Sequence, residues 1–307
     1  MSYTLQSFNQ AKRHSRRMRP GRLPGSDLTA IIMFLAMFLV FIFVLLPFCI
    51  RLIDNIRSRG LQHAKQLSQF QRIDAALGLF KSEFNYYPPS GALDENGRPY
   101  CGAMKLVEAI MGQDLNGFHP DSVFRRDGMD SKGTMLYPDT SNLSQQAYLD
   151  NMQVRKRFYF PDRQPYRLKD LYNGVGSFDG NEYVLCDEFW QVMDTGTFEK
   201  IGMPILYYKA DTSKTAHDIN DPNNPENIYN YRDNQSLLAL GVPGKPGQKH
   251  PLYENPKIFY EMIRNDKVAG SSKPFRADTY ILLSAGPDGL YGTEDDIANF
   301  DLRWRPK

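Results

Sequence analysis

The most hydrophobic part of the chain is a continuous run of 23 residues, 28–50, which contains no charge. A helix of this length rises far enough to cross a hydrocarbon core of about 30 Å. A buried core helix and a cleaved secretory signal are the alternatives. The run is longer than the apolar region of a signal, and no small-residue cleavage site follows it. The sequence therefore predicts one retained membrane-spanning helix.

Beyond this span, the apolar positions follow the period of an amphipathic helix. The stretch 52–84 contains no proline, and its apolar residues recur at steps of three and four: Phe70, Ile73, Leu77, Phe80 and Phe84. Pro88 and Pro89 then end the helix. We expect the span and this helix to be continuous, broken at most by Pro47, with the outer half packing one face on a globular head.

The remaining chain shows shorter elements, and 41% apolar residues over 307 positions suffice for a core. We expect a helix at 104–111, an irregular insertion at about 112–200 with short helices near 144–154, strands at 182–186, 204–210 and 279–286, and a helix at 256–265. The predicted fold class is α+β: a long N-terminal transmembrane helix that continues into a head with a small antiparallel sheet.

The charge distribution predicts the orientation of the span. Only Asp27 opposes six cations before it, which are Lys12, Arg13, Arg16, Arg17, Arg19 and Arg22. Such a flank stays in the cytoplasm, so the rest of the chain is expected outside. Removing these seven residues from the totals of 37 basic and 35 acidic residues leaves 31 and 34, a net charge of −3. A slightly acidic exterior part of this kind does not indicate nucleic-acid binding.

The exterior part offers little catalytic chemistry. Its histidines are scattered, and none of the motifs HExxH, GxSxG, SxxK or GxxxxGK[ST] occurs, so we expect no enzyme. We expect His119 to cap or pack a turn. Cys101 and Cys186 could form a disulfide in an oxidising compartment or remain two buried thiols, and both alternatives stay open.

Near the C-terminus, residues 284–300 read SAGPDGLYGTEDDIANF and carry four carboxylates within nine residues: Asp288, Glu294, Asp295 and Asp296. Carboxylates this close raise one another's pKa unless a cation or basic groups compensate. Calcium suits such a loop because it accepts oxygen ligands in flexible geometry. The glycines Gly286, Gly289 and Gly292 would let the backbone curl so that carbonyls turn inward. A solvated acidic turn is the alternative.

The order of these features resembles the type IV pilin and type II secretion pseudopilin family, especially its major-pseudopilin type. The resemblance is carried by Gly25 directly before the span, Pro47 within it, and the segments 73–90 (IDAALGLFKSEFNYYPPS), 202–211 (GMPILYYKAD) and 280–300 (YILLSAGPDGLYGTEDDIANF). It divides the chain into a basic cytoplasmic leader (1–27), the transmembrane helix (28–50), the exterior half of the long helix (51–87) and a pilin-like head (88–307) that contains the insertion.

The resemblance implies a function and a set of site residues. Prepilin peptidase would cut after Gly25 and leave Ser26 as the new N-terminus. The protein would be a single-pass inner-membrane component with its head in the periplasm or cell exterior, and its partners would be other pseudopilins or secretion or pilus platform proteins. A structural calcium ion would bind the side chains of Asp288, Asp295 and Asp296 and main-chain carbonyls near Leu283 and Leu290, with Glu294 pointing outward.

One departure from the family pattern changes the expected role. Family members usually carry Phe directly after the cleaved glycine and Glu at the fifth position, where this chain has Ser26 and Ala30. A buried N-terminal amine without its carboxylate partner would be costly. We therefore expect a minor, tip or uncleaved subunit rather than an ordinary filament-forming one. The alternative function is a membrane-tethered exterior binding module or hydrolase unrelated to secretion.

Overall fold

The structure is a computed structural model that describes residues 25–139, 144–158, 165–176, 178, 180–189, 192–193, 200–265 and 273–302. The side chains of residues 25–27 and 53–57 lie outside this description, as do the predicted basic leader and parts of the predicted insertion. The chain divides into two compact units, residues 1–57 and 58–307, and each is described by itself.

The N-terminal unit is helical throughout its described residues. Helix α1 (Gly25–Val40) is followed without a gap by a π-helical turn, η1 (Phe41–Leu45), and by α2 (Leu46–Phe84). The π-turn ends two residues before Pro47, whose missing N–H interrupts the regular hydrogen-bond ladder. The segment Leu28–Leu52 is long and apolar enough to cross a membrane, and none of it is buried. The expected continuity of the span with the following helix is confirmed.

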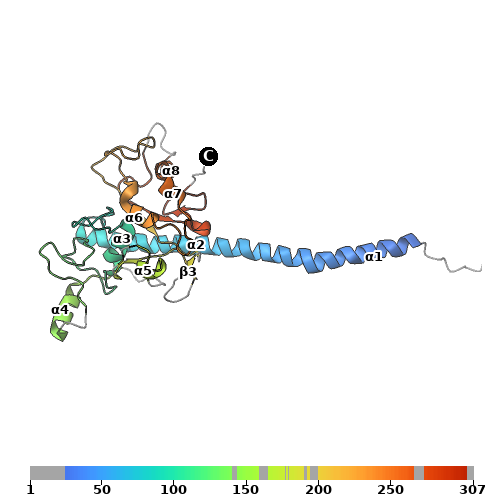
Figure 1. Cartoon of the computed structure of the whole chain (residues 1–307), viewed down its shortest axis with the longest axis horizontal. Coiled ribbons are helices and arrows are strands. Elements are labelled where there is room, and N and C mark those ends of the chain that lie inside the picture. Colours follow the sequence, from blue (N-terminus) through green and yellow to red (C-terminus); the bar gives the residue numbers. More distant parts are fainter. Residues whose placement is uncertain are drawn as a thin grey trace, which may run out of the picture. The chain divides into compact units, whose positions relative to one another are not determined.

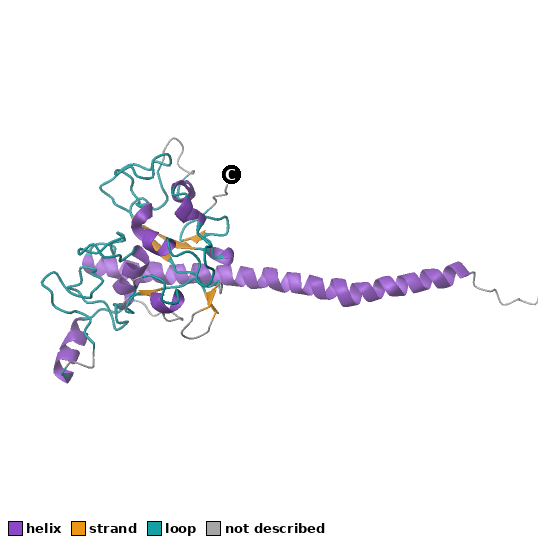
Figure 2. Cartoon of the chain, viewed as in Figure 1, coloured by secondary structure: helices purple, strands orange, loops and turns teal. Residues whose placement is uncertain are grey.

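The outer half of α2 forms the centre of the larger unit, and its buried face is the predicted one. Phe70, Ile73, Leu77 and Phe80 are at most 2% exposed and belong to the hydrophobic core, while Phe84 is half-buried against it. Short helices and strands of the unit gather around this part of α2 (Figures 1 and 2). The 3-4 spacing therefore identified the packing face correctly.

The other described elements are short and mixed. The helices are α3 (Gly102–Met111), α4 (Gln145–Val154), α5 (Leu168–Leu171), α6 (Gln235–Leu238), α7 (Pro251–Glu254) and α8 (Lys257–Met262), with 3-10 turns η3 (Tyr231–Asn234) and η4 (Gly286–Asp288). The strands are β1 (Tyr166–Arg167), β2 (Tyr183–Val184), β3 (Val192–Met193), β4 (Lys200–Ile201), β5 (Leu206–Lys209), β6 (Tyr280–Ser284) and β7 (Ile297–Ala298). The predicted α+β class is confirmed, although the antiparallel strands form three small sheets, β1-β2, β3-β4 and β5-β6-β7.

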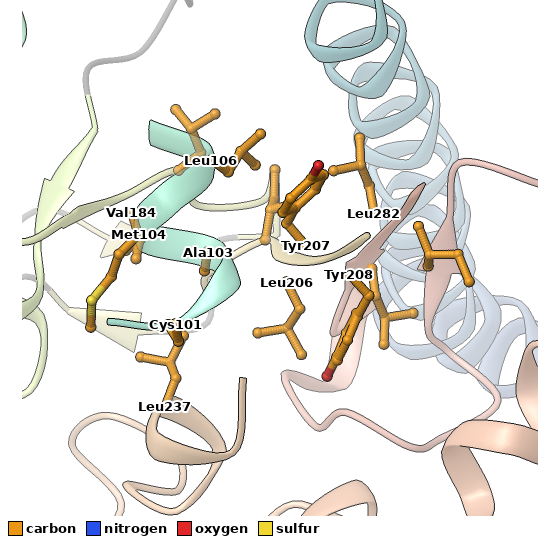
Figure 3. Packing of buried hydrophobic residues seen from close by; sticks show 14 of the residues in the cluster. Cys101, Ala103, Met104, Leu106, Val184, Leu206, Tyr207, Tyr208, Leu237 and Leu282 are labelled. Carbon is orange, nitrogen blue, oxygen red and sulfur yellow. The ribbon is translucent and has the colours of Figure 1, made fainter. Parts of the chain in front are cut away.

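The three-stranded sheet packs against helix α3 in the core. Figure 3 shows α3 side chains beside those of β5. The first helical residue, Gly102, lies so close to β5 that a Cβ there would be 2.1 Å from the carbonyl oxygen of Tyr207. The side chain of Asn234 joins the two elements, because its Oδ1 accepts from the Ala103 N–H at 2.9 Å and its Nδ2 donates to Tyr207 O at 2.8 Å.

A buried carboxylate anchors the start of the predicted insertion to α3. Glu108 of α3 is 1% exposed and accepts hydrogen bonds from four side chains: Tyr100, Gln113, Ser122 and Tyr137. Its burial raises the pKa of the carboxyl, and these donors oppose that shift. An irregular segment is thus tied to the core by polar contacts rather than by regular structure.

Two further predictions are settled in the described residues. Cys101 and Cys186 are buried free thiols, so the alternative without a disulfide holds in this structure. His119 caps a turn, since its Nδ1 accepts from the Asp121 N–H at 3.2 Å. The helix expected at 144–154 is α4, which begins after Ser144, and the Ser144 side chain accepts from Ala147 N as an N-cap.

Candidate metal centre

The acidic loop connects the central strand β6 to β7 and doubles back on itself. Gly286, Gly289 and Gly292 have φ values of +63°, +74° and +92°, a region in which side chains are strained. At Gly286 the backbone is also crowded, because a Cβ there would lie 1.9 Å from the carbonyl oxygen of Asp295. The positive φ values agree with a curled loop, as expected from these glycines.

The four carboxylates occupy different environments. Asp296 is 6% exposed, and its Oδ2 accepts from the Gly292 N–H at 2.7 Å. Asp288 and Asp295 are half-buried, and Asp288 Oδ1 accepts from the Leu290 N–H at 2.8 Å. Glu294 is exposed, as expected for a residue outside the proposed shell. The buried Oδ1 of Asp296 has no hydrogen-bond partner among the described residues.

The electrostatics of the loop show that the carboxylates act on one another. Burial raises the pKa of Asp296 well above its ordinary value, and the negative charges of Asp288 and Asp295 raise it further. Burial also raises the pKa of Asp288, with a smaller contribution from Asp295. Both shifts favour the neutral acid, and a cation bound beside these carboxylates would oppose them.

The two expected carbonyl donors differ in position. Leu290 lies in the loop, and its carbonyl accepts from the Thr293 hydroxyl at 3.3 Å. Leu283 lies in β6, where it pairs with Leu206 of β5 and Ala298 of β7. Since the Leu282 carbonyl accepts from Asn299 N on the β7 side, the alternation of an antiparallel ladder turns the Leu283 carbonyl toward β5.

A buried aspartate outside the loop holds its first turn. Asp187 is 1% exposed, and its Oδ1 accepts from the N–H groups of Phe189 and Met203 at 3.2 and 3.1 Å. Its Oδ2 accepts from the Ser284 hydroxyl at 2.7 Å, and the Ser284 oxygen in turn accepts from Gly286 N at 3.1 Å. Asp187 therefore positions the residue from which the acidic loop departs.

The same segment connects the loop support to α2. Gln69 donates from Nε2 to the Cys186 carbonyl at 3.0 Å, and Gln66 Oε1 accepts from the Glu188 N–H at 2.9 Å. Both glutamines are buried on α2. Hydrogen bonds thus run from α2 through residues 186–188 and Ser284 to the loop. This connection was not predicted from the sequence. The one feature of the sequence that pointed to it is Asp187, an acidic residue directly after the apolar strand residues YVLC.

The burial of Asp187 predicts a pH dependence of folding. Burial raises the pKa of its carboxyl to about 7, with Glu188 adding to the shift. A folded-state pKa above the unfolded value means that this group stabilises less as pH rises from about 4 to 7. Relative to Asp187→Asn, the native chain should lose roughly 3 kcal/mol between pH 4.5 and 7.5. Denaturation of both chains at pH 4.5 and 7.5 measures the difference, because every other titratable group is the same in the two chains. An equal pH dependence of the two chains would contradict it.

The predicted processing residues lie at the beginning of the described chain. Gly25 is the first residue of α1, and Ser26 follows it in the first helical turn. The side chain of Ser26 lies outside the described residues. The proposed cleavage site therefore lies in helical backbone.

In chemical terms, the loop offers two or three carboxylates and nearby main-chain carbonyls, which are ligands suited to a hard cation. In the conformation described here, no three His, Cys, Asp or Glu side chains of the described residues are grouped closely enough to hold a metal ion by themselves. Carbonyls and water would have to complete any shell. Comparison of the chain with known protein families, with curated proteins and with solved structures finds no match.

Proposed function

We propose that the protein is a membrane-anchored, pseudopilin-like component of a type II secretion or type IV pilus-type machine, in a minor or atypical position. The observation that carries the proposal is the helix from Gly25 to Phe84, which is apolar and exposed at 28–52 and buries one face in an α+β unit from Gln66 onward. A protein that anchors a folded head to a membrane through one helix needs one part of that helix to face lipid and the other part to pack on the head.

The proposal includes a structural calcium ion in the acidic loop. Its donors would be the side chains of Asp288, Asp295 and Asp296, drawn closer together than in the conformation described here, and the carbonyl of Leu290. The unpartnered, buried Oδ1 of Asp296 supports this assignment, because a buried carboxylate oxygen without a partner is costly. The ion would fix the loop between β6 and β7, so that the head presents one surface to its neighbours in the assembly.

Mass determination of the mature N-terminus tests the proposed processing. A chain that starts at Ser26 is the expected result, and it would establish cleavage after Gly25. A chain that starts at Met1 would indicate a fixed anchor. Reporter fusions at Ser15 and Lys307 should lie in opposite compartments, and the chain should copurify with secretion or pilus platform proteins after mild detergent extraction. Two cytoplasmic reporters would overturn the proposal.

Calcium should bind the full chain in detergent and raise its melting temperature. At a free calcium concentration 100 times the dissociation constant, one site adds about 2.7 kcal/mol to the free energy of unfolding. Asp296→Ala and Asp295→Ala should abolish or weaken this increase, because each removes a side-chain donor. Calorimetric titration and thermal unfolding with and without calcium measure both quantities.

Glu294→Ala is the matched control, since it removes a carboxylate from the same loop at an exposed position. Its calcium response should equal that of the native chain. If calcium neither binds nor stabilises the native chain, the loop is a solvated acidic turn and the calcium assignment is wrong. The N-terminal test would still stand, because it does not depend on the ion.

A further inference from the structure

A second site lies in the head, away from the acidic loop. A partly open pocket with a volume of about 140 Å³ is formed by residues between 222 and 232, which include the start of η3, together with Lys214 and with Tyr260 of α8. None of its lining residues belongs to the loop between β6 and β7. Its volume is well below the ~300 Å³ at which pockets for drug-sized ligands begin, so it can enclose one small chemical group.

The charged groups in the lining are cations. Lys214 and Arg232 line the pocket together with asparagines, tyrosines and prolines, and no carboxylate belongs to this lining. Lys214 forms a partly exposed ion pair with Asp211, whose Oδ2 lies 3.6 Å from the ammonium nitrogen. Arg232 is exposed. The pocket therefore attracts negative charge.

The hydrogen-bond acceptors of the lining asparagines are already used. Asn223 Oδ1 accepts from Arg232 Nη2 at 2.8 Å. Asn224 Oδ1 accepts from Glu226 N at 3.0 Å, and Asn227 Oδ1 accepts from Asp218 N at 2.7 Å. The fourth asparagine, Asn230, accepts from the Arg232 N–H at 3.1 Å. All four amide oxygens are thus occupied by the protein itself.

The donors of the lining are only partly used. The Nδ2 groups of Asn223 and Asn230 and the Nη1 group of Arg232 donate to no partner among the described residues, whereas Arg232 Nε and Nη2 are held by Tyr231 OH and Asn223 Oδ1. A guanidinium fixed on one side presents its remaining N–H groups in a set direction. The pocket consequently offers donors and positive charge to a ligand, and few acceptors.

The walls of the pocket are held by hydrogen bonds within the head. The Tyr260 hydroxyl lies 3.1 Å from Pro222 O and 2.9 Å from Tyr229 O. The Arg232 guanidinium lies 5.5 Å from the ring centroid of Tyr231. Preorganised donors lose little entropy when a ligand binds.

From these observations we infer that the pocket binds a carboxylate group, presented by an acidic side chain of a protein partner. A carboxylate is small enough for the volume, takes hydrogen bonds only as an acceptor, and forms charge-assisted bonds with arginine and lysine. The inference goes beyond the proposed membrane anchor and calcium loop and depends on neither. It assigns to the head a contact point for an acidic segment.

The test uses the full chain in detergent and a fluorescent peptide rich in Glu, with its Gln counterpart as the comparison. The acidic peptide should bind, the Gln peptide should bind at least tenfold more weakly, and the affinity should fall with added salt. Arg232→Gln and Lys214→Gln should each weaken binding several-fold or more. Glutarate should compete, and inorganic phosphate serves as the second anion.

Arg167→Gln is the matched control, because the Arg167 guanidinium also lies 5.5 Å from a tyrosine ring, that of Tyr183, outside the pocket. It should bind like the native chain. If Arg232→Gln does not fold, Asn230→Asp replaces it, since this exposed change keeps the acceptor for Arg232 N and replaces a donor by a negative charge. Equal affinity for both peptides, binding unaffected by the pocket variants, or competition by phosphate without competition by glutarate would overturn the inference.

Discussion

Leu77→Ala should lower the free energy of unfolding of the head by roughly 2–5 kcal/mol, the range for truncating a buried leucine to alanine and leaving a cavity. Leu77 is fully buried at the centre of the α2 face that packs on the core. Its neighbours are held by other elements and cannot all close on the lost volume. For a unit of this size, the melting temperature should fall by about 2–4 °C for each kcal/mol. Thermal or denaturant unfolding of the full chain in detergent measures the effect.

Leu79→Ala provides the control on the same helix, two residues away. Leu79 is 56% exposed, so its truncation removes little buried surface. Both variants place an alanine in the same helix, so the change in helix propensity is the same in the two. Its effect should stay within about 0.5 kcal/mol, as for most surface substitutions. Equal destabilisation by the two changes would show that α2 does not pack on the head by this face.

The long helices and the central strands could be predicted because their residues repeat a pattern over many positions. The face of α2 followed from five apolar residues at steps of three and four, and β5 and β6 from runs of β-branched and aromatic residues. Helix α3 begins at Gly102, two residues before the expected start, and this first residue lies so close to β5 that only glycine fits there. Such boundaries depend on a neighbour that the sequence pattern does not contain.

The elements that were not predicted are too short to carry a period. Strand β7 has two residues, and it exists because Ile297 and Ala298 pair with Ser284 and Leu283 across a loop. The strands β1, β3 and β4 are equally short. Their conformation is determined by tertiary pairing rather than by local preference, so no window of residues could reveal them.

The acidic loop could be identified from its own residues, but its support could not. The glycines and carboxylates stand within one short segment, whereas Asp187 lies 97 residues from the serine that it holds. In the sequence, the pocket beside Arg232 shows only as a stretch rich in aromatic residues and asparagines. Which asparagine oxygens accept hydrogen bonds, and which N–H groups stay available, is decided only when the chain folds. Contacts over long sequence separations require the folded chain.

Gly286→Ala should both destabilise the head and abolish the proposed calcium response without removing a carboxylate. The φ value of +63° costs an alanine about 1–2 kcal/mol. The new methyl group would also meet the carbonyl of Asp295 at 1.9 Å, so the backbone must shift, which adds roughly 1–3 kcal/mol. Since Asp295 lies beside Asp296, this shift would displace two proposed ligands together. Thermal unfolding and calorimetric titration measure the two losses.

Gly78→Ala is the matched control, because the same methyl group is added where nothing lies within 4 Å. Gly78 is an exposed position in the interior of α2, so alanine should stabilise the helix there by about 0.5–1 kcal/mol and leave the calcium response unchanged. The two glycine variants should therefore shift the melting temperature in opposite directions. A Gly286→Ala chain that melts like the native protein and binds calcium equally would show that the loop tolerates a different backbone, and that its curled conformation is not what places Asp295 and Asp296 near Asp288.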